Sequence, residues 1–173
     1  GTCELNHMTT QEISLNWLPL THVGGIVMFH LRDTYTLAEQ IQVDVNMILK
    51  NPLKWLDFCD QYRVTMTWSP LFAFSLINKH IDPDTDYGWD LSSIKNFISG
   101  GEANVAKTLH LFLKNLEKYG FSPDCVVPAF GMTETSSGIT YYRDLSPDTI
   151  SDSDRFVPCG EPLRGIEIRI TEQ

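Results

Sequence analysis

The chain has 173 residues, 42% of them hydrophobic, and a formal net charge of −9 from 13 Lys plus Arg against 22 Asp plus Glu. This length suits one domain with a sizeable core, and the composition excludes general disorder. The acidic balance argues against nucleic acid and anionic membrane surfaces as main partners. Phosphate groups held by local backbone amides and a metal ion stay compatible with it.

The four cysteines are scattered along the chain and form no C-x-x-C pair. Cys59 and Cys125 lie within apolar patterns, as small core residues do. This spacing argues against a disulfide framework or a zinc site and favours a reducing compartment, so we expect a cytoplasmic protein. No apolar run approaches about 18 residues, so no membrane span is predicted.

Short strands and helices alternate through the first part of the chain. Apolar and polar residues alternate at 13–17 and at 39–44, which predicts two half-buried strands. The apolar run at 26–31 between them predicts a buried helix. Asn51-Pro52 has the form of an N-cap followed by proline at the first helical position, which predicts a helix to about residue 63.

The second part of the chain repeats this alternation. Ser69-Pro70 again combines a capping residue with proline, and Gly120 stops a helix whose apolar residues recur every three or four positions. The predicted strands are 64–68, 94–98 and 125–128, and the predicted helices are 70–77 and 105–119. Strands and helices in this order predict an α/β protein with a doubly wound, mostly parallel sheet flanked by helices.

The last thirty residues predict a surface loop and a strand. Residues 144–154 are acidic and Ser-rich, and 165–170 alternate apolar with charged side chains. We expect 1–164 to form one α/β subdomain and 165–173 to begin a following one, in a chain excised from a longer protein. An apolar strand without a partner also favours a discrete homodimer of the isolated chain.

A group of chemically active residues follows the strand at 125–128. Ligands of open α/β sheets bind beyond the carboxyl ends of the strands. Phe130 offers a ring to a base, and Gly131 lets a backbone approach closely. Thr133 offers a hydroxyl to a phosphate, and Glu134 a hard oxygen to Mg²⁺. Such residues also suit an ordinary turn into a capped helix, so this segment alone leaves both interpretations open.

Three predicted strand ends share this pattern. They are Leu18-Pro19-Leu20-Thr21-His22, Ile98-Ser99-Gly100-Gly101-Glu102-Ala103 and Ala129-Phe130-Gly131-Met132-Thr133-Glu134. In this order and spacing they resemble the acyl-adenylate-forming, AMP-binding enzymes, which include acyl-CoA synthetases, luciferases and adenylation domains of peptide synthetases. The stretch 16–77 is most similar to acyl-activating domains that open hybrid polyketide and peptide synthases. The family's aromatic residue is normally Tyr, and Phe130 keeps its stacking face without the hydroxyl.

The resemblance implies roles for the residues of the last two segments. Phe130 would stack on adenine, Thr133 would contact the α-phosphate of ATP, and Glu134 would hold Mg²⁺. The nucleotide-binding set would also include Gly131, Met132 and the backbone of Gly100, Gly101, Glu102 and Ala103. Gly100-Gly101 also fits a plain strand-to-helix turn.

The same resemblance implies an acyl site at the first segment. His22 would be an aromatic gate between the acyl carboxylate and the phosphate, and would act in catalysis with Thr133 and Glu134. The walls of the acyl pocket would be Gly24, Gly25, Trp68 and Ser69. The alternative interpretations are that His22 is a loop histidine and that Trp68 is a core residue.

Several parts of the family pattern are missing from the chain: a Ser/Thr/Gly-rich phosphate loop with its Lys, a ribose-binding Asp and a catalytic Lys. We therefore expect a parent enzyme that joins a carboxylic acid to AMP, using ATP and Mg²⁺, while the chain alone is inactive or nearly so. The expected acceptor is an acyl carrier protein or coenzyme A. The alternative is a non-catalytic α/β module that binds a nucleotide or a protein.

Overall fold

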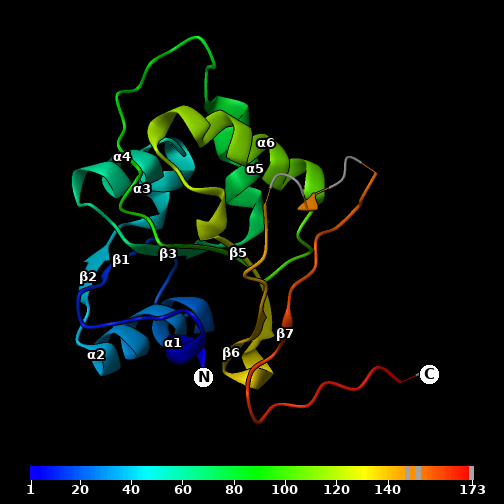
Figure 1. Cartoon of the computed structure of the whole chain (residues 1–173). Coiled ribbons are helices and arrows are strands. Elements are labelled where there is room, and N and C mark those ends of the chain that lie inside the picture. Colours follow the sequence, from blue (N-terminus) through cyan, green and yellow to red (C-terminus); the bar gives the residue numbers. More distant parts are fainter. Residues whose placement is uncertain (147–148, 151–152, 172–173) are drawn as a thin grey trace.

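A single sheet of seven strands organises the chain, and Figure 1 shows it edge on between two groups of helices. The computed structural model describes residues 1–146, 149–150 and 153–171. The strands are β1 (Ile13–Asn16), β2 (Glu39–Gln42), β3 (Met66–Ser69), β4 (Asn96–Ser99), β5 (Val126–Met132), β6 (Ser137–Tyr141) and β7 (Glu161–Pro162). They lie in the order β2-β1-β3-β4-β5-β6-β7.

The first five strands are parallel, and β6 and β7 add an antiparallel edge. The predicted α/β class with a mostly parallel sheet is confirmed. β2 pairs with one edge of β1, and β3 pairs with its other edge. The strand order therefore reverses between β1 and β3, and such a switch point opens a crevice at the carboxyl ends of the strands.

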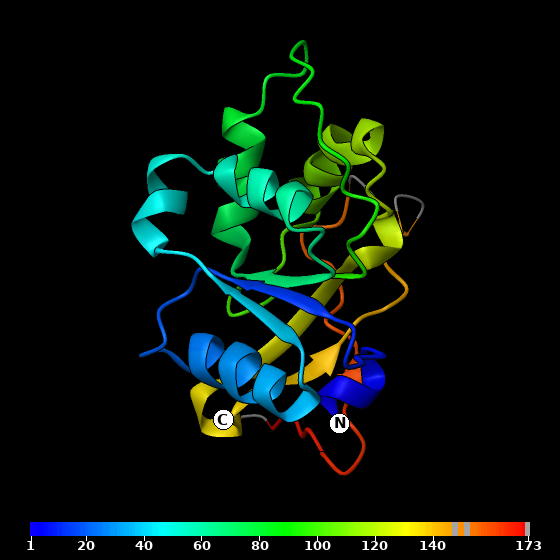
Figure 2. The same cartoon turned by 90° about the vertical axis from the view of Figure 1, so that its left-hand side faces the viewer.

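Helices cover both faces of the sheet. The α-helices are α1 (Thr2–Leu5), α2 (Arg32–Thr36), α3 (Val45–Lys50), α4 (Lys54–Gln61), α5 (Leu71–His80) and α6 (Ala106–Leu116). Gly24–Leu31 forms a π-helix, η1, that runs directly into α2, and the 3₁₀ turns are η2 (Glu117–Tyr119), η3 (Pro123–Cys125) and η4 (Thr133–Thr135). Helices α3 to α6 lie on one side of the sheet, and α1 and α2 on the other (Figures 1 and 2).

The side under α3 to α6 holds the larger core, which we call the packed face. Its centre is Trp55 of α4, whose ring centroid lies 4.6 Å from that of Phe97, 5.5 Å from Trp17 and 5.9 Å from Phe74. The Trp55 indole N–H donates to the Thr67 hydroxyl of β3 at 2.9 Å. Buried aromatic rings in such edge and tilted contacts dominate the stability of a core.

The opposite side holds a smaller apolar cluster, which we call the cavity face. Its members are Met28, Phe29, Met66, Trp68, Ile98, Val127, Ala129 and Tyr141. Successive residues of a strand point to opposite faces, so β3 sends Thr67 to the packed face and Trp68 to the cavity face.

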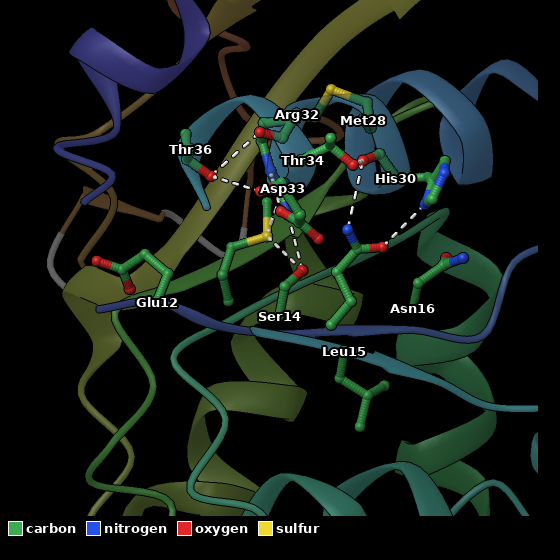
Figure 3. Close-up of polar contacts among 12 residues, drawn as sticks. Glu12, Ser14, Leu15, Asn16, Met28, His30, Arg32, Asp33, Thr34 and Thr36 are labelled. Atoms are coloured by element: carbon green, nitrogen blue, oxygen red, sulfur yellow. Dashed lines mark hydrogen bonds and ion pairs between the residues drawn. The ribbon is translucent and has the colours of Figure 1, made fainter. Parts of the chain in front are cut away.

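A buried ion pair lies beside this smaller cluster. Figure 3 shows the contacts of Arg32 with Asp33, its neighbour on α2, and with Ser14 of β1. The guanidinium pairs with the Asp33 carboxylate and donates to the Ser14 hydroxyl at 2.7 Å and to the Met66 sulfur at 2.8 Å. One Asp33 oxygen, Oδ2, has no hydrogen-bond partner among the described residues. Burial raises the pKa of Asp33, which Arg32 opposes, and burial lowers the pKa of Arg32.

Two helix starts differ from the prediction. An unpredicted helix, α3, begins after Asp44, whose carboxylate accepts the Asn46 N–H at 2.7 Å. The predicted cap at Asn51 belongs to the turn that follows, and α4 begins at Lys54 with no side-chain cap. Aspartate is as strong a capping residue as asparagine, so the capping signal was present seven residues earlier than it was assigned.

The predicted strand at 165–170 is absent. These residues lie outside the sheet, with Ile170 98% exposed. The boundary at 164/165 stays a prediction. The expected loop at 144–154 includes 147–148 and 151–152, which lie outside the described residues, and its Leu145 and Ile150 are buried in the larger core. Across the described ranges, no helix is both long and apolar enough to cross a membrane.

Candidate functional site

A cavity of about 310 Å³ opens where β1, β3, β4 and β5 end, at the edge that the strand order predicts. Its lining comes from the loop after β1, the start of η1, the ends of β3 to β5, and β6. The predicted site residues that line it are His22, Gly24, Trp68, Gly100, Gly101, Phe130, Gly131, Met132, Thr133 and Glu134. Segments more than a hundred positions apart in the sequence therefore meet in one hollow.

Two glycines at the start of η1 have different tasks. A Cβ on Gly24 would lie 2.1 Å from the Trp68 ring, so this glycine lets the indole lie flush with the helix. The Gly24 N–H donates to Nδ1 of His22 at 3.0 Å, which leaves the imidazole proton on Nε2. A Cβ on Gly25 would lie 2.3 Å from the Pro19 carbonyl oxygen. Gly25 therefore serves backbone packing and does not line the cavity.

Three further predicted residues also lie outside the cavity lining. Ser69 is fully buried, and its hydroxyl donates to the Pro70 carbonyl oxygen at 3.1 Å. The Glu102 carboxylate accepts the Phe72 N–H at the start of α5, where it caps the helix in place of the predicted Ser69. Ala103 is exposed on the same loop. These residues support the elements around the site instead of facing a ligand.

The mouth of the cavity is formed by the end of β5 and by η4. The Phe130 ring is 42% exposed there, and Thr133 and Glu134 are exposed beside it. A Cβ on Gly131 would lie 2.1 Å from the Ser137 carbonyl oxygen, because β5 and β6 pair closely after a register shift at Phe130/Gly131. Gly131 is therefore required by the hairpin itself, whatever approaches the mouth.

The deep end of the cavity is apolar and was not predicted from the sequence. Met28, Ile98 and Tyr141 close it, and each is at most 5% exposed. The Tyr141 hydroxyl donates to the Met28 sulfur at 3.6 Å. Burial raises the pKa of Tyr141, so the phenol stays protonated and able to donate. The other lining residues that were not predicted are Val23, Pro70, Ala129, Ser137 and Gly138.

The residues of the mouth are of types that could contact a nucleoside triphosphate. The mouth presents an aromatic face, glycine backbone, a hydroxyl and one carboxylate within a few residues. Among the described residues no group of three or more His, Cys, Asp and Glu could hold a metal ion. A magnesium ion here would be held by the Glu134 carboxylate together with phosphate and water oxygens, which is how Mg²⁺ is often bound beside phosphates.

Fold and site together define an open-sheet α/β protein with a ligand cavity at its strand-order switch, exposed and polar at the mouth and apolar at depth. A family model described as AMP-binding enzyme matches residues 2–173. The chain belongs to the AMP-binding enzyme family, as its three strand-end motifs predicted.

Known relatives place the chain among adenylation domains. Nonribosomal peptide synthetase apvA of Aspergillus terreus is 35% identical over 162 residues, which cover 91% of this chain and 18% of the relative. The chain spans less than a fifth of the length of the first curated relatives it matches.

Two solved structures share the fold at still higher identity. The adenylation domain of a keto acid-selecting NRPS module, bound to keto acyl adenylate, is 43% identical with a TM-score of 0.80, over 85% of this chain and 27% of that one. McyG A-PCP complexed with phenylalanyl-adenylate is 41% identical with a TM-score of 0.85, over 93% of this chain and 25% of that one.

Proposed function

We propose that this chain supplies the acyl pocket and one side of the ATP site of an acyl-adenylate-forming domain. The observation that carries the proposal is a single cavity with an exposed, nucleotide-type mouth at Phe130, Thr133 and Glu134 and a buried apolar end at Met28 and Tyr141. A carboxylic acid whose side chain fills the apolar end would present its carboxylate at the mouth. ATP supplies the α-phosphate that the carboxylate attacks, and pyrophosphate leaves.

The residues of the mouth bind and orient in this reaction. The exposed ring of Phe130 offers a stacking face to adenine. The Thr133 hydroxyl would donate to a phosphate oxygen, and the Glu134 carboxylate would hold a magnesium ion, which would supply neutralisation of the phosphate charge. His22 keeps its proton on Nε2 because Nδ1 accepts from Gly24, so its ring donates to an oxygen of the carboxylate or phosphate. Positioning and charge neutralisation of this kind are the main work of an enzyme in such a transfer.

The cavity lining indicates the type of acid, and a relative indicates the type of acceptor. Trp68, Ile98 and Tyr141 favour an apolar or aromatic side chain, in line with relatives described as bound to keto acyl and phenylalanyl adenylates. We propose a carrier-protein thiol as acceptor, since one relative is described as A-PCP, with coenzyme A as the alternative. We also propose that the chain belongs to a polyketide/peptide synthase and that the isolated chain forms a homodimer. All four cysteines are free, which supports a reducing, cytoplasmic setting.

ATP–pyrophosphate exchange across a panel of acids tests the proposal in the longer protein that carries this chain. Glu134→Gln should lower exchange about a hundredfold, since loss of one preorganised charge contact costs on that scale, while thermal stability stays unchanged. Glu117→Gln, an exposed glutamate at the end of α6, is the matched control and should exchange normally.

Other outcomes of the exchange assay separate the alternatives. The isolated chain should exchange at background, because the phosphate loop and catalytic Lys are not among its residues. A longer protein that binds ATP but exchanges with no acid would overturn the proposal in favour of a non-catalytic nucleotide-binding module. Normal exchange by a folded Glu134→Gln protein would remove the magnesium role alone.

A further inference from the structure

The loop between β1 and η1 carries His22 to the cavity, and it begins at a buried amide. Asn16, the last residue of β1, is 1% exposed. Figure 3 shows its side chain on the same side of β1 as that of Ser14 and opposite that of Leu15. This is the cavity face of the sheet, but Asn16 is not part of the cavity lining. Any influence of this amide on the site therefore acts through the residues that it contacts.

The Asn16 carboxamide holds the backbone of Leu18 at two points. Its Oδ1 accepts the Leu18 N–H at 3.0 Å, and its Nδ2 donates to the Leu18 carbonyl oxygen at 3.0 Å. The same Nδ2 donates to Oε1 of Gln42 on β2 at 2.8 Å. Both N–H groups of the amide and its oxygen are thus used, and they join the start of the loop to two neighbouring strands.

The peptide that follows Leu18 fixes the backbone of His22. The Pro19 carbonyl oxygen accepts the His22 N–H at 3.0 Å, and the His22 carbonyl oxygen accepts the Ile26 N–H at 3.0 Å. A Cβ on Gly25 would lie 2.3 Å from the Pro19 oxygen and 3.0 Å from the Leu18 oxygen, so η1 packs directly against these carbonyls. The turn 18–22 is therefore held between Asn16 and η1.

We propose that Asn16 is a positioning residue for adenylation: by fixing the turn 18–22, it holds the His22 imidazole where the acyl carboxylate meets the phosphate. The inference rests on the proposed function, which gives His22 its contact with the reacting groups. Without the Nδ2 donor the Leu18 carbonyl oxygen loses this hydrogen bond, and the turn relaxes to find another partner. His22 moves with the turn, because its N–H is bonded to Pro19, the next residue.

ATP–pyrophosphate exchange in the longer protein tests the inference. Asn16→Asp keeps the size and the acceptor oxygen, but an ionised carboxylate has no donor for the Leu18 carbonyl oxygen. The kcat should fall about tenfold or more, because displacing a reacting group by about 1 Å can cost up to about a hundredfold. The KM for ATP should stay within about twofold, because Phe130 and Glu134 belong to other elements. Asn46→Asp, the same change at an exposed asparagine of α3, is the matched control and should exchange normally.

A double-mutant cycle with His22→Ala distinguishes positioning from a general structural role. If Asn16 acts through His22, Asn16→Asp should lower kcat by less than about twofold in a protein that already carries His22→Ala. The same loss in both backgrounds would show that Asn16 acts elsewhere and would overturn the inference. An undiminished kcat in the single variant Asn16→Asp would overturn it as well.

Hydrogen exchange of the longer protein gives a second readout that needs no activity. The N–H groups of Leu18, His22 and Ile26 are bonded within the turn and η1. In Asn16→Asp the segment 18–26 should therefore exchange about fivefold to tenfold faster, on the scale of one lost hydrogen bond, while 126–135 keeps its rates. Unchanged exchange across 18–26 contradicts the inference, even where His22→Ala leaves too little activity for the cycle.

The remaining outcomes separate this inference from the proposed function. Normal pyrophosphate exchange in the unaltered protein, with an undiminished kcat in Asn16→Asp, overturns the inference alone. Absence of pyrophosphate exchange with every acid in the unaltered protein overturns the proposed function, and the role of Asn16 in adenylation with it. If Asn16→Asp does not fold, Asn16→Ser takes its place with the same expectations, because serine is neutral and too short to hold both groups of Leu18.

Discussion

The two faces of the sheet are built from the same strands but differ in what fills them. On the packed face Trp55, Phe74 and Phe97 contact one another in edge-to-face and tilted arrangements and are fully buried. On the cavity face a smaller apolar cluster borders the cavity, and a buried ion pair lies beside that cluster. Close-packed interiors supply most of the free energy of folding. The packed face therefore supplies most of the stability of the chain, so the cavity face can contain a cavity without unfolding the protein.

The largest expected effect compares one tryptophan from each face. Trp55→Ala should lower the free energy of unfolding by about 3–5 kcal/mol, because it empties the centre of the packed face and leaves the Thr67 hydroxyl without its donor. Trp68→Ala should cost about 2 kcal/mol, because one side of that ring already borders the cavity. Urea denaturation of both variants measures the difference. Equal losses would contradict the division between the faces.

The next prediction concerns the ion pair of the cavity face. Arg32→Met should destabilise the chain by about 3 kcal/mol, because it leaves the buried Asp33 carboxylate without a counter-charge. The double change Arg32→Met with Asp33→Leu should recover most of that loss. Burial raises the pKa of Asp33 even beside Arg32, so without the guanidinium the single variant should lose stability as the pH rises above the ordinary carboxyl range. Melting temperatures that are independent of pH would contradict this account.

A smaller effect is expected at the amino ends of the strands. Glu12 accepts hydrogen bonds from Thr65 and from Lys95, which precede β3 and β4. Burial alone would raise its pKa, but these hydrogen bonds outweigh it and leave that pKa below the ordinary 4.5. The stability that Glu12 adds is thus present above pH 4.5 and lost as the pH falls through the lower folded pKa.

A variant that cannot ionise isolates this contribution. Glu12→Gln should lower stability by about 1–2 kcal/mol at neutral pH and flatten the acid limb of the stability curve. Denaturation midpoints measured from pH 3 to 7, with the unaltered chain beside the variant, provide the comparison. An unchanged acid limb would mean that other carboxylates govern it.

The smallest effect on stability is expected at the cavity mouth. The Phe130 ring is 42% exposed, so Phe130→Ala should change the free energy of unfolding by less than about 0.5 kcal/mol. In the longer protein the same change should weaken ATP use by about tenfold, the scale of a lost base-stacking contact. A large loss of stability would show that the mouth, too, serves as core.

Local signals in the sequence predicted the parallel part of the fold well. The strands β1, β3, β4 and β5 lie in apolar or alternating runs, and the apolar residues of α6 recur at helical spacing. The strand-end motifs then predicted the mouth of the cavity, because the carboxyl ends of parallel strands converge. Within each motif the residues are adjacent in the sequence as well as in the structure.

The deep end could not be predicted in the same way. Met28 lies in the apolar run 26–29, where no pattern shows which side chain faces a hollow. Tyr141 lies on β6, which was not predicted, although Ile139 and Tyr141 alternate with Thr140 as strand residues do. That period-two signal was available. The contact of Tyr141 with Met28 could not be predicted from the sequence, because it depends on the path of two segments separated by 113 positions.

That contact has a consequence for the order in which the molecule assembles. The hydroxyl of Tyr141 joins residues that precede it by 113 and 139 positions. Closing so long a loop is entropically costly, and contacts between distant segments form slowly. The β5–β6 hairpin, by contrast, brings together near neighbours in the sequence. During synthesis the hairpin can form as it emerges, whereas the contacts of Tyr141 with Thr2 and Met28 form only when β6 packs against the first residues of the chain. We therefore expect the floor of the cavity to form late in folding.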